Sequence, residues 1–426
     1  MALIALVVLL CLGATAHAEV LVRWDQDRIP SRQSLGIDAV VVPVENPRAV
    51  RHALTHGYRV FVEVPAPRLA SVAVPATGIA GVIVRGTVSA AQLAELKARV
   101  KSRAVRVLTI DERGKWPHIR ANWVTRNNDV LQVSGRTAQP WIENNAALAR
   151  IIAQEDPGRD EDAAFITYAW KPITVSQEDE GPALADYLVA IDEAGSFGVN
   201  LVLPLHRRFQ RNLLRGTPQA RTDWAAIRRH LEFYSWDLAS RYEHVANVGV
   251  VTANPTLWFE VMNLLLRHNL PFELIAPAEL PKRKLEAFQL VIVLDEPDRA
   301  GREVLTAFER AGGLAKIVNA PVDPNGFALE MRQLLGRERR IIDIWNGITV
   351  LTSLYAEPGG TGALLTVLNY AQQPLPVQLR IAGTYAQAQY ESPEDAATYV
   401  PVRHRNGFTE FVLPSVRIGG RVFLTR

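Results

Sequence analysis

The stretch AVVVPVENPRAVRHALTHGYRVFVEV, residues Ala39 to Val64, places two apolar runs on either side of a segment with helical spacing. A strand, a helix and a second strand in this order are typical of a parallel βαβ unit. The alternation extends in both directions along the chain. Eight short apolar runs lie between Val20 and about Ser240: VLVRWD, AVVVPVE, YRVFVEV, AGVIVRG, VRVLTID, DVLQVSG, AAFITYAW and NLVLPLH. This repeat predicts an α/β fold, a compact (β/α)8 TIM barrel over residues 19–243.

Two further units follow the predicted barrel. The runs VANVGVVTA and FQLVIVLDEPD are each followed by a segment with helical spacing, which predicts a small doubly wound α/β domain over residues 244–340. From residue 341 to residue 426 the pattern changes to alternating runs broken by Gly, Pro and Asn, among them ALLTVLNY and LPVQLRIAG. This pattern of alternating runs and turn residues is typical of an antiparallel β-sandwich.

The composition is that of a folded globular protein, with 48% hydrophobic and 21% charged residues among 426. The formal net charge is only +3, and no basic stripe is interleaved with aromatic residues, so we expect no nucleic-acid partner. The nine histidines show no metal-ligand spacing, and there is no GxGxxG sequence and no P-loop. We therefore expect no metal and no cofactor, and the sequence leaves oligomerisation open.

The N-terminal segment MALIALVVLLCLGATAHA, residues 1–18, is an apolar run that ends in the small-residue sequence Ala16-His17-Ala18. This pattern is typical of a signal peptide and its cleavage site. We expect a periplasmic or secreted protein with no membrane span after signal cleavage. The single cysteine, Cys11, lies inside this segment, so disulfides and thiolate chemistry are not expected in the mature chain.

Candidate functional residues lie at the carboxyl ends of the barrel strands, where barrel enzymes place their reacting groups. Strand alternation selects the inward side chains. In VRVLTIDE we assign Leu108 and Ile110 to the helical shell, which selects Asp111 rather than Glu112 as the inward carboxylate. The same test directs Arg23, Phe61 and Ile83 inward and Leu201, Leu203 and Leu205 to the shell. The residues predicted to converge on one mouth are Asp25, Glu63, Arg85, Asp111 and His206, with Trp24, Trp116, Tyr168 and Trp170 in or near the loops above.

This set of side chains has two interpretations. In the first, the mouth binds a sugar between aromatic platforms, and two carboxyl groups act as acid and as base or nucleophile. In the second, Asp25, Glu63 and Asp111 form a self-neutralising network with Arg23 and Arg85 that stabilises the barrel. A proton donor beside a permanent cation would have its pKa lowered, which favours the second interpretation.

The chain from the barrel to the C-terminus resembles the family 42 glycoside hydrolases, the beta-galactosidases. The segment GALLTVLNYAQQPLPVQL, residues 362–379, is similar to their C-terminal sandwich, and VGVVTANPT is similar to the opening of their amidotransferase-like middle domain. The resemblance implies the same order of barrel, α/β domain and sandwich. It also implies a catalytic Glu preceded by Asn at the end of the fourth strand and a nucleophilic Glu at the end of the seventh.

The positions that match these glutamates read Arg85-Gly86 and Ala169-Trp170-Lys171, and no Asn-Glu pair occurs in the chain. The family's catalytic residues therefore do not carry over. Two hypotheses follow. In the first, the protein acts on a poly- or oligosaccharide with Asp111 and Glu63 as its carboxyl pair, and with Asp25, Trp24, Arg85, Trp116, Tyr168, Trp170 and His206 binding substrate. In the second, it is a catalytically inactive envelope protein that binds glycan or a protein partner.

Overall fold

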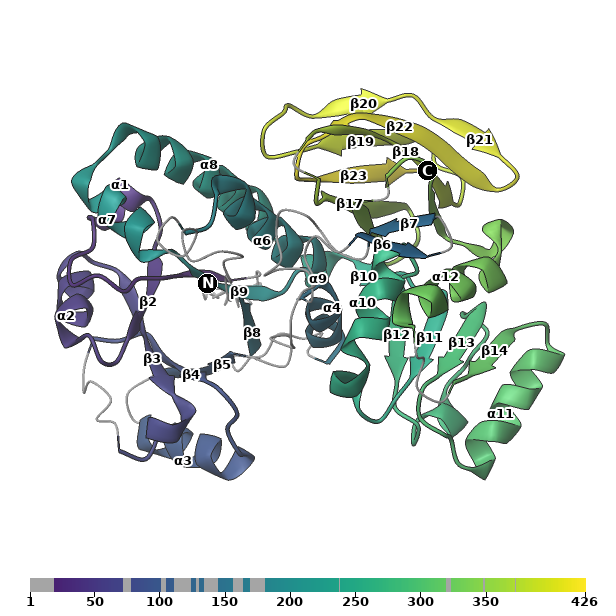
Figure 1. The fold of residues 1–426 in the computed structure, drawn as a ribbon, viewed down its shortest axis with the longest axis horizontal. Coiled ribbons are helices and arrows are strands. Elements are labelled where there is room, and N and C mark those ends of the chain that lie inside the picture. The colour runs from purple at the N-terminus through teal and green to yellow at the C-terminus, as the bar shows by residue number, and fades with distance from the viewer. Residues whose placement is uncertain are drawn as a thin grey trace, which may run out of the picture.

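A barrel, an α/β domain and a β-sandwich pack against one another in the computed structural model (Figure 1). The structure describes residues 19–71, 78–100, 105–110, 124–127, 130–133, 145–155, 164–168, 181–236, 238–318, 323–347, 349–371 and 373–426. Among these residues, none of the helices has the length and apolar character that a bilayer crossing requires. The predicted fold class, a TIM-like barrel followed by α/β and β-sandwich units, is confirmed.

Seven parallel strands close the barrel in the order β1-β2-β3-β4-β5-β8-β9, and β9 pairs with β1. Their bounds are β1 (Val20–Arg23), β2 (Ala39–Pro43), β3 (Arg59–Pro65), β4 (Gly81–Arg85), β5 (Arg106–Ile110), β8 (Ala164–Thr167) and β9 (Asn200–Pro204). Seven of the eight predicted runs therefore form barrel strands.

The predicted sixth strand, in DVLQVSG, is wrong as a barrel strand. Its residues form β7 (Val130–Val133), which pairs antiparallel with β6 (Val124–Asn127) in a separate two-stranded sheet. Only two residues connect β6 to β7. A connection that short suits an antiparallel hairpin, whereas a parallel barrel strand needs a crossover of a dozen or more residues.

The barrel interior is filled by bulky apolar side chains from alternate positions of the strands. The buried members of this interior cluster are Leu21, Ala39, Val41, Phe61, Ile83, Leu108, Ile110, Phe165 and Val202. The intervening residues, including Val60, Val62 and Val107, pack outward with the helices. The predicted alternation is thus confirmed for β1, β3, β4 and β9. It is wrong for β5, where Leu108 and Ile110 face inward and Val107 faces the shell.

Five of the barrel helices occupy segments in which the sequence shows helical spacing, whereas the helices at Arg32–Leu35 and Arg207–Arg215 lie outside those segments. The bounds of the barrel helices are α1 (Arg32–Leu35), α2 (Pro47–Thr55), α3 (Ala90–Val100), α4 (Asn145–Glu155), α6 (Leu184–Phe197), α7 (Arg207–Arg215), α8 (Pro218–Tyr234) and α9 (Leu238–Arg241). Every residue of α6 from Asp186 to Phe197 is buried. A helix that is buried on all sides lies between two packed units.

The α/β domain contains a parallel sheet in the order β12-β11-β13-β14. Its elements are β11 (Val248–Val251), α10 (Phe259–Arg267), β12 (Phe272–Ile275), β13 (Leu290–Val293), α11 (Arg299–Arg310), β14 (Leu314–Ile317) and α12 (Pro324–Leu335). One face of the sheet packs in the large core with α10 and α12, and the other packs with Leu305 and Phe308 of α11. Helices on both faces make the domain doubly wound.

The C-terminal residues form two packed antiparallel sheets. The six-stranded sheet has the order β10-β16-β17-β23-β19-β20, and the four-stranded sheet has the order β15-β18-β22-β21. The bounds are β10 (Glu243–His244), β15 (Ile342–Ile344), β16 (Val350–Ala356), β17 (Gly362–Asn369), β18 (Leu375–Ala382), β19 (Gln387–Glu391), β20 (Thr398–Val400), β21 (Arg403–Arg405), β22 (Phe408–Val416) and β23 (Gly419–Thr425). The strand β10 follows the barrel helices in sequence but pairs with β16 of the sandwich.

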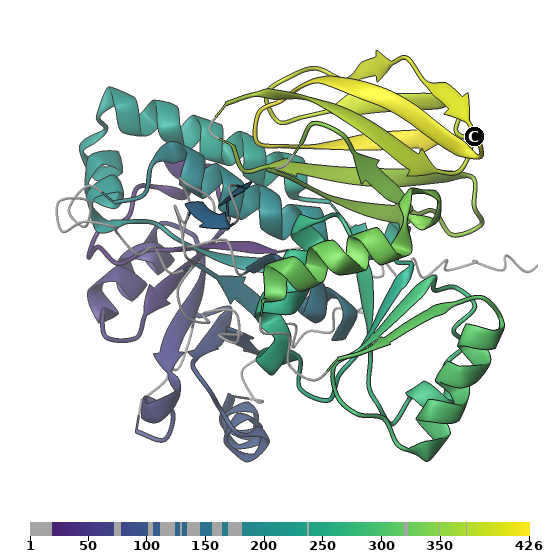
Figure 2. The ribbon, with the colours of Figure 1, turned by 45° about the vertical axis from the view of Figure 1, so that its right-hand side comes forward.

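The sandwich lies against α6 and α8 of the barrel, as both views show (Figures 1 and 2). A chain of three ionisable side chains crosses this contact. His230 of α8 bonds through Nδ1 to Asp192 Oδ1 of α6 at 2.6 Å, and through Nε2 to Glu394 Oε1 of the sandwich at 2.9 Å. The side chains of Asp192 and His230 are almost wholly buried. An imidazolium held between two carboxylates therefore joins the barrel to the sandwich.

Candidate functional site at the barrel mouth

A cavity of about 570 Å³ opens at the carboxyl ends of β1 and β2 and the start of α7. We call it the mouth cavity. Its walls carry three acidic and three basic side chains among the lining residues Arg23, Asp25, Asp27, Pro43, Glu45, Asn46, Pro47, Arg48 and Arg207. Alternation along β1 accounts for its floor, because Leu21 fills the barrel interior and Arg23 and Asp25 follow it on the same side.

Arg23 is the centre of an ion-pair network beneath this cavity. Its Nε donates to Glu63 Oε2 at 2.8 Å, its Nη2 donates to Glu63 Oε1 at 3.2 Å, and its Nη1 lies 2.7 Å from Asp25 Oδ1. Arg85 adds a longer contact of 3.4 Å from Nη1 to Glu63 Oε1. Both oxygens of the buried Glu63 therefore accept hydrogen bonds from arginines.

The backbone that carries Asp25 is fixed by two amide side chains. Gln210, fully buried in α7, accepts from the Asp25 N–H at 2.9 Å and donates to the Leu205 carbonyl at 2.7 Å. Asn46 donates to the Asp25 carbonyl at 3.1 Å and accepts from the Ala49 N–H as the N-cap of α2. Neither residue is among the predicted site residues. An Asn before Pro47 is a helix-start signal that could have identified Asn46, whereas no local pattern marks Gln210.

The Asp25 carboxyl is a mouth group whose pKa the surroundings shift. Burial raises the pKa of Asp25, and the charges of Arg23 and Arg207 oppose this without reversing it. Arg207 itself is exposed, and it makes no ion pair with any residue that the structure describes. A carboxyl acceptor and an uncommitted guanidinium donor thus face the same cavity.

Two of the predicted aromatic platforms do not face the mouth. Trp24 is completely buried in the helical shell, and its Nε1 donates to the Arg28 carbonyl at 2.7 Å. Tyr168 is also buried, with its hydroxyl 2.9 Å from Glu193 Oε2. Both follow the outward phase of their strands, so their rings pack against helices and do not offer a face to a ligand. The prediction that Trp24 and Tyr168 lie at the mouth and bind substrate there is therefore corrected.

His206 caps the helix beside the cavity. Its Nδ1 accepts from the Arg208 N–H at 3.3 Å at the start of α7, and its own N–H bonds to the Tyr187 hydroxyl at 3.0 Å. The structure thus gives His206 a defined role in holding the first turn of α7, which also carries Arg207 and Gln210. A substrate contact by its half-buried ring stays a prediction.

The remaining predicted residues, Asp111, Trp116 and Trp170, lie outside the described residues. Asp111 is selected over Glu112 on the expectation that Leu108 and Ile110 face the helical shell. Both residues face the barrel interior, so strand alternation no longer selects Asp111. Among the predicted residues, the structure therefore brings together Asp25, Glu63 and Arg85. Arg23 bridges Asp25 and Glu63, and Arg85 contacts Glu63. Within the described part of the chain, no group of three or more His, Cys, Asp or Glu side chains could hold a metal ion.

Comparisons with known proteins support the architecture. No protein-family model matches the chain, and no curated protein matches it in sequence. Its structure is similar to that of alpha-L-fucosidase isoenzyme 2 from Paenibacillus thiaminolyticus, with a TM-score of 0.61 and 10% identity over 96% of this chain and 100% of that one. The structure of Gan42B, a GH42 beta-galactosidase from G. stearothermophilus, matches over 96% of this chain and 98% of that one, with a TM-score of 0.43 and 8% identity. At 10% identity the similarity to the fucosidase shows a shared fold, and the expected order of barrel, α/β domain and β-sandwich is confirmed.

Proposed function

We propose that the protein binds a poly- or oligosaccharide in the mouth cavity. The observation that carries this proposal is that Asp25 and Arg207 line one cavity, with the Asp25 backbone fixed by Gln210 and Asn46. A rigid carboxylate accepts hydrogen bonds from sugar hydroxyls, and a guanidinium donates to their oxygens. The cavity, at about 570 Å³, has the size of an ordinary small-ligand site. The glycoside-hydrolase-like fold supports a carbohydrate as the ligand.

Hydrolysis at the same mouth is the second candidate function. Burial raises the pKa of Asp25, which is the direction that a general acid requires. In this alternative Glu63 and Asp111 remain the proposed carboxyl pair, with Asp25 as a third carboxyl group. The ion pairs of Glu63 with Arg23 and Arg85 favour binding without cleavage, because they occupy both oxygens that a nucleophile or base would use.

The binding proposal is tested by titration calorimetry of the full chain with a panel of neutral and acidic oligosaccharides. We expect Asp25→Asn and Arg207→Ala each to weaken binding about tenfold, the loss expected from removing one charge-assisted hydrogen bond. The matched controls are Glu303→Gln and Arg299→Ala, an exposed ion pair on α11, which should leave affinity unchanged. Equal affinity in the mouth variants and the controls, or no binding by any glycan, would contradict the proposal.

The same panel separates the two candidate functions. Release of new reducing ends by the native chain, lost in Asp25→Asn, Glu63→Gln or Asp111→Asn while binding persists, would establish hydrolysis. Binding without any release would establish the catalytically inactive alternative. Each variant is first compared with the native chain by circular dichroism, so that loss of fold is not read as loss of chemistry.

We also propose that the chain is exported, on the sequence of residues 1–18. Expression of the full-length chain in a Gram-negative host should give periplasmic protein that begins at Glu19. N-terminal sequencing of the fractionated protein checks this. Material that retains residues 1–18 and sediments with membranes would show a retained anchor instead.

A further inference from the structure

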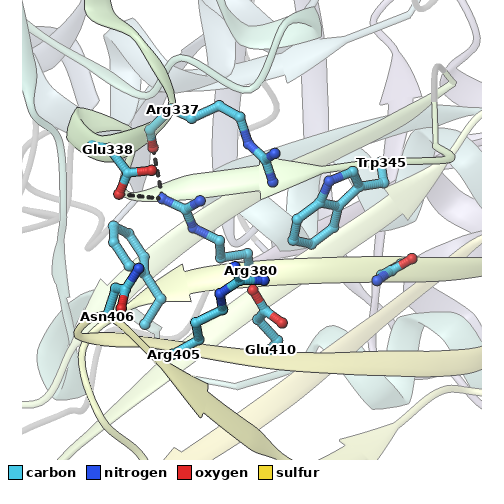
Figure 3. Close-up of a pocket in the computed structure, with 9 residues that line it drawn as sticks. Arg337, Glu338, Trp345, Arg380, Arg405, Asn406 and Glu410 are labelled. Atoms are coloured by element: carbon cyan, nitrogen blue, oxygen red, sulfur yellow. Dashed lines mark hydrogen bonds and ion pairs between the residues drawn. The ribbon is translucent and has the colours of Figure 1, made fainter.

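A second cavity, of about 340 Å³, lies on the outer face of the four-stranded sheet of the sandwich (Figure 3). We call it the sandwich pocket. It is lined by Arg337, Glu338, Trp345, Gln378, Arg380, Arg405, Asn406, Phe408 and Glu410. None of these residues lines the mouth cavity, and none belongs to the barrel.

Strand alternation explains why polar side chains gather on this face. In β18, Val377, Leu379 and Ile381 pack into the sandwich core, so Gln378 and Arg380 point the opposite way. The register places Asp343 of β15, Arg380 and Glu410 of β22 in one row across three strands. Alternating charges in neighbouring strands stabilise one another, and two members of this row, Arg380 and Glu410, line the sandwich pocket.

Arg380 is a fixed part of the floor. Its side chain is almost wholly buried, its guanidinium carbon lies 3.8 Å from the centroid of the Phe408 ring, and its Nη2 donates to the Arg337 carbonyl at 2.8 Å. Glu338 approaches the same nitrogen at 3.5 Å. The contacts with the Arg337 carbonyl and with Glu338 are drawn as dashed lines in Figure 3. Together with the Phe408 ring they hold Arg380 as a fixed positive charge beneath the pocket.

Two walls of the pocket carry groups that are open to solvent. Trp345 follows β15 and remains 40% exposed, with the Arg337 guanidinium carbon 5.0 Å from its ring centroid. Arg405 ends β21 and is followed by Asn406 and Gly407, both with positive φ, which is the two-residue turn of a tight hairpin. This turn fixes the position of Arg405. No ion pair joins Arg405 to any other residue of the described ranges.

The charges of the lining favour an anion. Three arginines (337, 380 and 405) and two glutamates (338 and 410) line the pocket, a net charge of +1 on the lining. Arg337 also donates from Nε to Asp343 Oδ2 at 3.0 Å, so Arg405 is the lining arginine that has no ion pair among the described residues. The exposed indole offers a flat apolar face, and Gln378 and Glu410 offer hydrogen-bond partners beside it. A sugar ring, which has an apolar face of C–H groups, hydroxyl groups and here one negative charge, matches all of these features together.

We propose that the sandwich pocket binds an acidic saccharide, with a sugar ring stacked on Trp345 and its carboxylate or sulfate group bound by Arg405 and Arg337. The proposal is independent of the function proposed for the mouth cavity. The two anionic groups share the chemistry that the arginines recognise, since a guanidinium can donate two parallel hydrogen bonds to two oxygens of a carboxylate or of a sulfate group. Gln378 and Glu410 then bind hydroxyl groups of the same ring.

The test is titration calorimetry of the full chain with three short oligosaccharides of equal length: an oligogalacturonate, a sulfated heparin fragment and a neutral cello-oligosaccharide. We expect at least one acidic ligand to bind about tenfold more tightly than the neutral one, and its affinity to fall as salt is added. Trp345→Ala and Arg405→Ala should each weaken that binding about tenfold. Arg405 is exposed, so its replacement leaves the fold intact.

The matched aromatic control is Tyr399→Ala on β20 of the other sheet, where the ring is 66% exposed. It should bind the acidic ligand as the native chain does. Neutral binding as tight as acidic binding would overturn the proposal. So would unchanged affinity in both Trp345→Ala and Arg405→Ala, or acidic binding that is lost in Asp25→Asn alone, which would assign the ligand to the mouth.

Discussion

Replacement of Glu63 by glutamine is expected to lower the free energy of unfolding by about 2–4 kcal/mol. Glu63 is 4% exposed and accepts from Arg23 and Arg85, whose side chains are 20% and 40% exposed. Without the carboxylate, Asp25 is the one acidic partner of Arg23 among the described residues, and Arg85 loses the negative charge at position 63. Removing one member of a buried ion pair leaves the other charge uncompensated, and the partial exposure of the arginines reduces this cost.

Urea denaturation measured side by side with a matched variant checks this expectation. The control is Glu45→Gln at the same mouth, since Glu45 pairs with Arg68 at 2.6 Å but both side chains are about half exposed. Exposed pairs contribute roughly 0–1 kcal/mol, so the control should unfold near the native midpoint. A Glu63→Gln midpoint equal to that of Glu45→Gln would show that the network does not stabilise the barrel.

The second large effect is expected at His230, where stability should depend on pH. Burial acts to lower the pKa of His230, but the contacts with Asp192 and Glu394 outweigh it and raise this pKa from 6.5 to about 9. The folded state therefore binds a proton that the unfolded state releases above pH 6.5. The stabilisation is complete below pH 6.5 and is lost as the pH rises through about 9, a change on the order of 3 kcal/mol.

Other ionisable groups near His230 titrate outside this interval. Burial raises the pKa of Asp192 to about 6, which lies below the interval, so this carboxyl is ionised over most of the interval. Burial also raises the pKa values of the neighbouring tyrosines Tyr234 and Tyr390 above their usual 10. Arg417, which acts on Glu394, stays charged throughout. The loss of stability between pH 6.5 and 9 is therefore assigned to His230.

Unfolding of the native chain and of His230→Gln, measured at intervals from pH 6 to pH 9.5, tests the assignment. The variant should be less stable by about 3–5 kcal/mol at pH 6.5, because two carboxylates lose their cation, and should show little further loss up to pH 9. His404→Gln, an exposed histidine of β21, is the control and should keep the native pH dependence. A native slope that survives in His230→Gln would contradict the assignment.

The sequence predicts the three units of the fold because each has a distinct period of apolar residues. It mistakes β7 for a barrel strand because a short alternating run fits a hairpin as well as a barrel. It assigns the wrong phase to β5 because both sides of a barrel strand are buried: Val107 fills the shell as Leu108 and Ile110 fill the interior. Apolar character alone does not separate the two sides of such a strand.

The phase of the strands also decides which site residues can be identified from the sequence. Asp25, Glu63 and Arg85 lie at or near the ends of strands whose phase is clear. Arg23 contacts Asp25 and Glu63, and Arg85 contacts Glu63, because the closed barrel brings these strand ends together. Long-range contacts leave no local pattern. His230 is separated by 38 residues from Asp192 and by 164 from Glu394. The sandwich pocket likewise depends on the pairing of β15, β18 and β22, which the sequence does not specify.

The central claim, that the mouth cavity binds a glycan, is tested most directly by a crystal structure of the full chain with a saturating oligosaccharide from the panel. We predict a sugar ring in the mouth cavity with hydroxyl oxygens within hydrogen-bonding distance of the Asp25 carboxyl and the Arg207 guanidinium. A saturated protein that carries sugar only in the sandwich pocket, or elsewhere on its surface, with none in the mouth cavity would contradict the claim.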